Sequence, residues 1–357
     1  MKRKILLGCA ALLLTVLLSG RVFWMDGEYL SVTPHAAQEE LAQKAAAEVT
    51  SYAQLCNVLT DMVENYREEC IISIVGFNNA TTDYYISAAI DHVRKNTAVG
   101  AFGVEKIDYE VGVNRSTAVV AMDIYYTRTR ADILGMNKVR NTEEMTARIT
   151  QALEHHDAYV VMRTDEYQTV DFTQLVQNYA NEHPDLIMET PQVSVFVYPQ
   201  RGQDRIVELT FTYRTDRESL RKMQEQVSPV FTSAELYVKE TTQVRDIYAR
   251  LYSFLMERDE YTLETSITPS YSLLHHGVGD SRAFANVYAA MCRNADLDCT
   301  VISGTRDSEP WCWNLVRFRG KYYHVDLLGC SEKGKFEMLS ASEMDGYVWD
   351  YSAHPSS

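Results

Sequence analysis

The sequence predicts an α+β fold with an N-terminal membrane segment, two small repeated units and a C-terminal domain of a different pattern. An apolar run near the start of the chain indicates the membrane segment. Two stretches in the middle share one order of strand-like and helix-like patterns, which indicates the repeat. The last third instead has helical spacing followed by alternating apolar residues, as in antiparallel strands.

Residues 1–25 combine a basic start with a long apolar run. The letters MKRK precede ILLGCAALLLTVLLSG, and the run then meets Arg21 rather than a small-residue cleavage pattern. The segment is long enough to span a bilayer, and its basic start favours a cytoplasmic N-terminus. We therefore expect a signal anchor in the cell membrane, with the C-terminal part extracytoplasmic. The alternative is a cleaved signal peptide and a secreted protein.

The composition of the chain limits the classes of partner and cofactor that we expect it to bind. The net charge of −15 over 357 residues argues against nucleic-acid binding. The seven cysteines form no CxxC pair, so we expect mostly buried free thiols, with one disulfide among the four cysteines within 292–330 as the alternative. The histidines and cysteines lack metal-ligand spacing. We expect neither a metal nor another cofactor.

The segment 26–67 has apolar residues at helical spacing and predicts a helical stalk. Two α+β units, 68–157 and 158–236, are then predicted to repeat one order of elements: strand, helix, strand, strand, helix (βαββα). DYYISAAIDHVRKN in the first unit matches DFTQLVQNYANEH in the second. STAVVAMDIYYTRTRAD likewise matches DRIVELTFTYRTDRES. The alternative is a chance likeness of two unrelated stretches. We find no catalytic cluster in either unit, and their many tyrosines suit docking.

The third region, 237–357, begins with an amphipathic helix and the loop HHGVGD. Asp280 can cap the next helix, which places Ser281 at its first position, near the positive end of the helix dipole. A serine there still needs an adjacent base to act as a nucleophile.

The stretch EPWCWNLVRFRGKYYHVD predicts a β-hairpin that turns at Arg319 and Gly320. Phe318 then pairs with Lys321. Because side chains alternate between the faces of a strand, one face receives two indoles, an imidazole and a carboxylate. These belong to Trp311, Trp313, His324 and Asp326.

From GVGDSRAFANVYAAMCRNADLDC through TVISGT to WCWN and YYHVD, the sequence resembles the transglutaminase-like family, which has a papain-like fold. The resemblance covers about a quarter of the chain and implies a degenerate bacterial member. Ser281 stands at the position of the nucleophilic Cys, and Trp311 at that of the general-base His. Asp326 stands at the position of the Asp that orients this His.

Two of the three catalytic positions have therefore changed. An indole N–H donates a hydrogen bond and cannot accept a proton, so Trp311 cannot activate Ser281. The resemblance thus implies a pseudoenzyme. The alternative is an acyl-transfer enzyme that pairs Ser281 with an unconventional base, for which His275, His276 and His324 are the candidates.

The aromatic face of the hairpin offers a second role. Trp313, Tyr322 and His324 on this face, with Asn314 on the opposite face, are our candidate binding residues, and stacked rings suit an extended peptide or a sugar. We expect the partner to be a peptide, a cell-wall component or a surface protein. In the competing interpretation the tryptophans only fill the former cleft.

Overall fold

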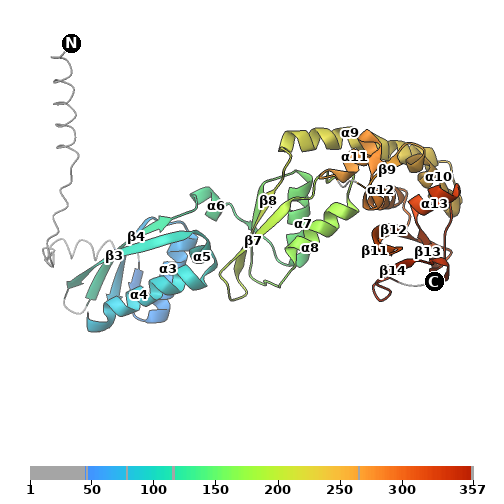
Figure 1. The fold of residues 1–357 in the computed structure, drawn as a ribbon. Coiled ribbons are helices and arrows are strands. Elements are labelled where there is room, and N and C mark those ends of the chain that lie inside the picture. The colour runs from blue at the N-terminus through green and yellow to red at the C-terminus, as the bar shows by residue number, and fades with distance from the viewer. Residues whose placement is uncertain (1–44, 46, 78, 115–116, 264–265, 355–357) are drawn as a thin grey trace, which may run out of the picture.

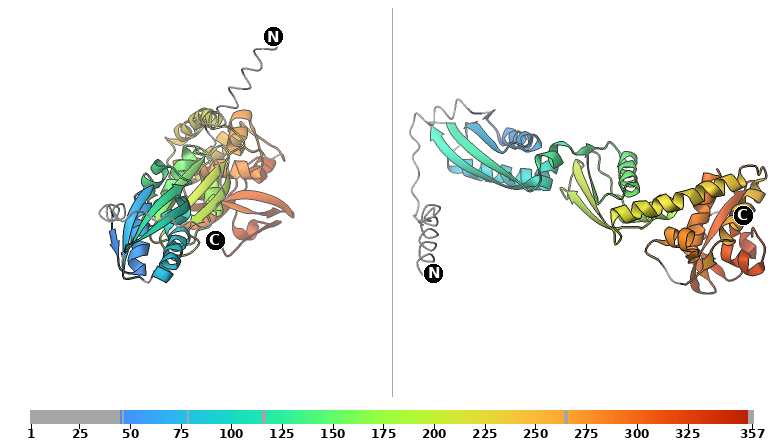
Figure 2. Two further views of the ribbon diagram at one scale, coloured as in Figure 1. Left: turned by 90° about the vertical axis from the view of Figure 1, so that its left-hand side faces the viewer. Right: turned by 90° about the horizontal axis from the view of Figure 1, so that it is seen from above.

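The computed structural model describes residues 45, 47–77, 79–114, 117–263 and 266–354. Three α+β units follow one another in a row (Figures 1 and 2). The predicted signal anchor lies outside the described residues. Within the described part of the chain, no helix combines the length and apolarity needed to cross a membrane.

The first unit is a four-stranded sheet with helices on one face. Its strands have the order β1-β2-β4-β3, with β1 parallel to β2 and the other pairs antiparallel. Alternate residues of β2, Ile72 and Ile74, are buried under the helices. The elements are β1 (Ala47–Val49), α3 (Tyr52–Glu64), β2 (Glu69–Val75), α4 (Asn79–Asn96), α5 (Ala98–Gly103), β3 (Val104–Asn114) and β4 (Thr117–Tyr126).

The second unit has the same strand order and the same strand directions, β5-β6-β8-β7 with only β5 and β6 parallel. A short helix, α6 (Arg130–Leu134), leads into it. Its elements are β5 (Asn137–Lys138), α7 (Thr142–Glu154), β6 (Tyr159–Thr164), α8 (Phe172–Glu182), β7 (Gln192–Tyr198) and β8 (Arg205–Thr212).

The turns that follow α3 and α7 match in detail. Tyr66 and His156 each adopt a positive φ, 54° and 51°, at the same point after the helix. In both turns the next backbone N–H donates to a carbonyl five residues earlier, at Met62 and at Ala152. This is a common way to end a helix before a strand.

The element boundaries differ from those expected. We predicted a helical stalk over 26–67. The described residues of this segment instead belong to the first unit, because β1 pairs with β2 and α3 covers the sheet. Helix α7, expected within 68–157, instead packs under the second sheet. Strands β1 and β5 were missed because two or three residues show no period.

The third unit contains a four-stranded antiparallel sheet, ordered β13-β12-β11-β14, packed against α12. The long helix α9, yellow in Figure 1, also packs into this core, so the unit begins before residue 237. Its elements are α9 (Arg217–Val238), α10 (Val244–Met256), β9 (Glu260–Tyr261), α11 (Pro269–His276), β10 (Val278–Gly279), α12 (Ser281–Asn294), β11 (Cys299–Arg306), β12 (Glu309–Phe318), β13 (Lys321–Val325), α13 (Leu327–Lys333), η1 (Ala341–Glu343) and β14 (Tyr347–Trp349).

All six described cysteines are free, as predicted. Burial raises the pKa of the thiols of Cys70 and Cys330 to about 11. These thiols therefore remain protonated near neutral pH and pack as small apolar groups.

Charged contacts join the first two units. The Arg163 guanidinium binds the carboxylate of Glu64 at 2.5 and 2.8 Å and that of Asp204 at 2.7 and 2.8 Å. Nearby, Arg128 donates to Glu208 at 2.7 Å. Only 18% of the Arg163 side chain is exposed, so water screens these bonds less than it screens surface pairs.

We predict that Arg163→Met lowers the free energy of unfolding of the protein by about 1.5–3 kcal/mol, because charge-assisted bonds to two carboxylates are lost. Urea denaturation followed by circular dichroism measures the change. Arg140→Met is the control, since Arg140 is 87% exposed in its pair with Glu144 and should cost less than about 0.5 kcal/mol. Equal effects of the two variants would contradict the prediction.

Candidate functional site: Ser281, Trp311 and Asp326

Ser281 begins α12, as the sequence predicted, with Asp280 as the N-cap. The Asp280 carboxylate accepts a hydrogen bond from the backbone N–H of Ala283 at 2.8 Å. The Ser281 side chain is buried, and its Oγ accepts from the backbone N–H of Cys312 at 3.2 Å. No ionisable side chain among the described residues hydrogen-bonds to this hydroxyl.

The hairpin has the predicted register, which is confirmed by the pairing of Phe318 with Lys321. Arg319 and Gly320 form the turn, both with positive φ. The Trp311 side chain lies near the other end of β12, in contact with Tyr261 and at 3.1 Å from Asp326, to which its Nε1–H donates.

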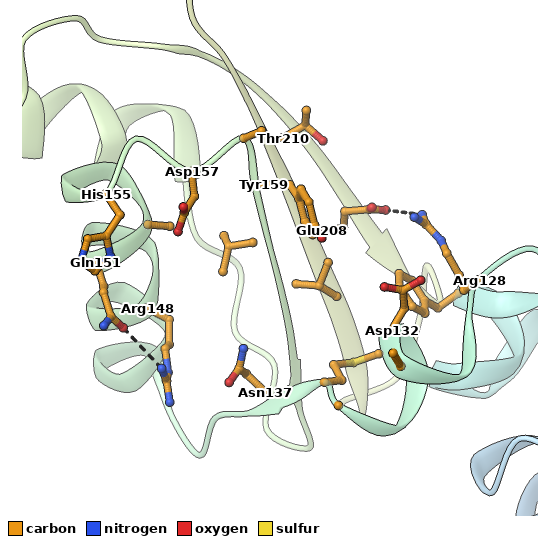
Figure 3. A pocket seen from close by; sticks show the side chains of 18 of the residues that line it. Arg128, Asp132, Asn137, Arg148, Gln151, His155, Asp157, Tyr159, Glu208 and Thr210 are labelled. Carbon is orange, nitrogen blue, oxygen red and sulfur yellow. Dashed lines mark hydrogen bonds and ion pairs between the residues drawn. The ribbon is translucent and has the colours of Figure 1, made fainter. Parts of the chain in front are cut away.

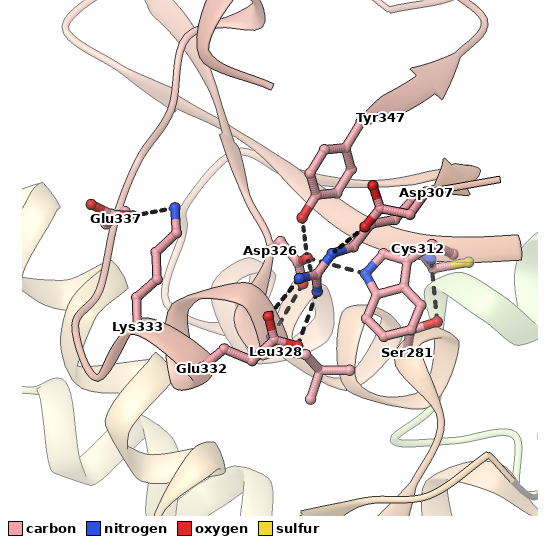
Figure 4. Close-up of polar contacts among 11 residues, drawn as sticks. Ser281, Asp307, Cys312, Asp326, Leu328, Glu332, Lys333, Glu337 and Tyr347 are labelled. Carbon is pink, nitrogen blue, oxygen red and sulfur yellow. Dashed lines mark hydrogen bonds and ion pairs between the residues drawn. The ribbon is translucent and has the colours of Figure 1, made fainter. Parts of the chain in front are cut away.

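Asp326 caps α13 and accepts hydrogen bonds from several directions (Figure 4). Its Oδ2 accepts from Tyr347 at 2.5 Å, in addition to Trp311, and Arg306 lies 3.4 Å away. Its Oδ1 accepts from the backbone N–H of Leu328 at 3.1 Å. A carboxylate that is only 5% exposed therefore has its charge and its lone pairs satisfied.

The charges around Asp326 are mutually compensating. Arg306 also binds Glu332 at 2.5 Å, and this bond, followed by Tyr347 and Asp326, raises the pKa of the guanidinium. Burial and the neighbouring Asp326 raise the pKa of Tyr347, so its hydroxyl stays protonated and can donate. Sequence reasoning missed both Arg306 and Tyr347.

The space between these groups is closed. The gap bounded by Ser281, Cys312, Asn314 and Asp326 is too narrow to hold a water molecule, since the volume open to one is about 0 Å³. The groups that pack around Ser281 in this gap therefore leave no room between them for a reacting molecule. Burial also raises the pKa of the Cys312 thiol, which lies 3.6 Å from the Ser303 hydroxyl rather than beside Asp326.

The candidate histidine bases are engaged elsewhere. His324 Nδ1 accepts from the indole N–H of Trp313 at 3.0 Å. Burial, with a smaller effect of His354, lowers the pKa of His324 to about 4, so the ring is neutral. His275 and His276 are exposed on α11 and pack against Tyr271. Neither hydrogen-bonds to Ser281.

The binding role predicted for Trp313, His324 and Asn314 does not fit their burial, since at most 2% of each is exposed. Trp313 and His324 pack under Trp349, and the Asn314 amide donates to the Ala285 carbonyl of α12 at 2.8 Å. The predicted faces are correct, but β14 and η1 cover the aromatic one. Tyr322 is half-buried and lines an open groove.

Open grooves lie elsewhere on the described part of the protein. The β6 groove, about 950 Å³, lies over β6 between α6 and α7 (Figure 3). Its floor includes Tyr159, which is 62% exposed. Two of its arginines are paired with acidic groups, Arg128 with Glu208 and Arg217 with Asp157.

The second open groove, the β11 groove, has a volume of about 750 Å³ and lies between α8, α12 and β11.

Among the described residues, no cluster of His, Cys, Asp and Glu could hold a metal ion.

The arrangement defines a class of protein. A helix whose first residue faces an antiparallel sheet, with an Asp at the end of a following strand, is the framework of a papain-like fold. Residues 232–327 match the family model of the transglutaminase-like superfamily. The third unit is therefore a transglutaminase-like domain, as the sequence resemblance implied.

Three solved structures are similar to the chain. A structure described as a TGase has 11% identity and a TM-score of 0.28, over 55% of this chain and 59% of that chain. A "putative cysteine protease" from Cytophaga hutchinsonii has 13% identity and a TM-score of 0.27, over 44% and 70%. A "putative protease" from Parabacteroides distasonis has 8% and 0.24, over 72% and 40%. At these TM-scores we draw nothing from them. No curated protein matches the chain.

We predict that Asp326→Asn lowers the free energy of unfolding of the third unit by about 2–3 kcal/mol, because Arg306 and Tyr347 lose a buried anionic partner. Urea denaturation followed by tryptophan fluorescence measures it. Glu332→Gln is the matched control: this second partner of Arg306 is 58% exposed, and its loss should cost less than about 1 kcal/mol. A neutral Asp326→Asn variant would show that the carboxylate does not hold the sheet together.

His324 should make the third unit less stable in acid. The unfolded chain protonates this ring near its ordinary pKa, about 6.5, whereas the folded protein resists protonation until pH falls to about 4. Stability attributable to His324 is thus lost as pH falls, by about 2–3 kcal/mol from about pH 7.5 to about pH 4.5.

The measurement is the difference between wild type and His324→Gln in urea denaturation across this range, because Gln keeps an acceptor for Trp313 but does not titrate. The difference is needed since other groups also titrate with shifted pKa, including Asp259, whose pKa burial raises to about 6. Parallel stability curves for the two proteins would refute the assignment.

Proposed function

We propose that the transglutaminase-like domain does not catalyse acyl transfer and acts as a binding module. The observation that carries this proposal is the hydrogen bond from the Trp311 indole to Asp326. It occupies the carboxylate that would orient a catalytic base, and it supplies no base in return.

The surroundings of Ser281 support the same conclusion. Among the described residues, the hydrogen-bond partner of its side chain is a backbone N–H, which leaves the hydroxyl a neutral alcohol. In a catalytic triad, loss of the nucleophile or the base alone typically costs on the order of 10⁶ in kcat. The closed gap beside Ser281 adds a steric obstacle to any rescue by another base.

We further infer that the first and second units are two copies of one module. Their shared strand order and their matching positive-φ turns after α3 and α7 support this inference. Two such units in a row would act as a spacer that carries the third unit away from the N-terminal end (Figure 2).

The remaining proposals rest on the sequence. The basic and apolar residues 1–25 support a signal anchor in the cell membrane, with the three units on the extracytoplasmic side. On that side the domain would meet a peptide, a cell-wall component or another surface protein.

A fluorophosphonate probe tests the absence of catalysis, because it labels only activated serines. We expect no labelling of the folded protein above the level of Ser281→Ala, under conditions in which a known serine hydrolase is fully labelled. Circular dichroism establishes that both proteins are folded. Labelling that disappears in Ser281→Ala would overturn the proposal and support an enzyme with an unconventional base.

A further inference from the structure

The β11 groove follows a strand edge that has no partner. Strand β14 pairs with β11 only at residues 304–306. The remaining residues of β11, 299–303, have β12 on one side, and on the other side no described strand pairs with them. Several of them line the groove, including Val301 and Ser303.

The register tells which backbone groups face the groove. Arg306 and Glu309 flank the two-residue turn, so they form a hydrogen-bonded pair, and such pairs recur at every second residue. Residues 304, 302 and 300 therefore direct their N–H and C=O toward β12. Val301 and Ser303 direct theirs into the groove. The bond from Asp307 N–H to the Gly346 carbonyl confirms this alternation on the β14 side.

A buried amide in the groove wall also lacks a partner. Asn286, on α12, is 7% exposed and lines the groove. Its Nδ2 donates to Asn181 Oδ1 of α8 at 3.4 Å, whereas its Oδ1 is buried without a hydrogen-bond partner. Since buried polar groups are normally satisfied, this oxygen indicates a missing donor.

The groove is lined by Arg282, Arg293 and Arg317 and also by Glu182 and Asp298, and only its Arg282 end favours an acidic side chain. Of its arginines, Arg293 is paired with Asp185 and Arg317 with Asp298. Arg282 is exposed at the end of the groove near Ser281, and no ion pair with it exists among the described residues. Within the described part of the chain it is therefore an unpaired cation, in a protein whose net charge is −15.

We propose that the β11 groove binds an extended peptide, which adds a strand beside β11 in line with β14 and places an acidic side chain near Arg282. Strand addition satisfies the free N–H and C=O groups of Val301 and Ser303, and such main-chain bonds are a recurrent source of peptide affinity. The proposal rests on the non-catalytic binding role proposed above, and it names the ligand class and the place of binding.

Three fluorescein-labelled nonapeptides of alternating valine and threonine test the proposal on the full-length protein by fluorescence anisotropy. The Glu probe has a central glutamate, and the Lys probe has lysine there. The methyl probe is the Glu probe with alternate backbone amides N-methylated. We expect the Glu probe to bind, the Lys probe to bind about tenfold more weakly, and the methyl probe not to bind.

Two variants locate the site. Arg282→Glu should reverse the preference, so that the Lys probe binds more tightly than the Glu probe. Arg201→Glu is the control: it is exposed in the loop after β7, does not line the groove, and should leave the preference unchanged. Val301→Pro removes an N–H that faces the groove without removing a bond to β12, and should weaken the Glu probe about tenfold while circular dichroism stays native.

Hydrogen exchange gives a readout that does not depend on variants. The Glu probe should slow amide exchange in the peptide segment 299–303. Failure of the Glu probe to bind at about 1 mM, equal binding of the methyl probe, or unchanged exchange in this segment would each overturn strand addition. None of these outcomes would show that the domain is catalytic, because fluorophosphonate labelling tests that question separately.

Discussion

The carboxylate of Asp326 is the contact on which the third unit depends. It follows β13 directly, and its partners come from the other three strands: Arg306 from β11, Trp311 from β12 and Tyr347 from β14. One buried anion therefore ties together all four strands of the sheet. It also begins α13, through the backbone N–H of Leu328.

The same contacts explain why the domain keeps the framework of a papain-like fold without its open cleft. A catalytic carboxylate must leave room for an imidazole and a substrate, whereas Asp326 is enclosed by an indole, a phenol and a guanidinium. The short strand β14 completes this enclosure. Close approach of β14 requires Gly304, because a Cβ there would lie 2.2 Å from the Val348 carbonyl oxygen. Strand β14 covers residues 304–306 of β11 and encloses Asp326. Because β14 is so short, the rest of the β11 edge stays uncovered and borders the β11 groove.

Turn and capping residues in the sequence predicted the hairpin and the start of α12 correctly. The turn at Arg319 and Gly320 fixed the hairpin register, and the cap at Asp280 placed Ser281 at the helix start. Alternation also assigned the faces of β12 and β13 correctly. It could not tell whether a face is open, because that depends on β14, a three-residue strand without a pattern of its own. For this reason we expected Trp313 and His324 to be accessible to a ligand, whereas both are buried. Arg306 and Tyr347 were missed because their approach to Asp326 depends on strand pairing far along the chain.

The arrangement around Asp326 also limits what substitutions at positions 281 and 311 alone could achieve. A Cys at position 281 and a His at position 311 would not rebuild a triad, because Tyr347 and Arg306 would compete with the imidazole for the same carboxylate oxygen. Catalysis at these positions would also require the sheet to release β14, and so to give up contacts that hold its four strands together.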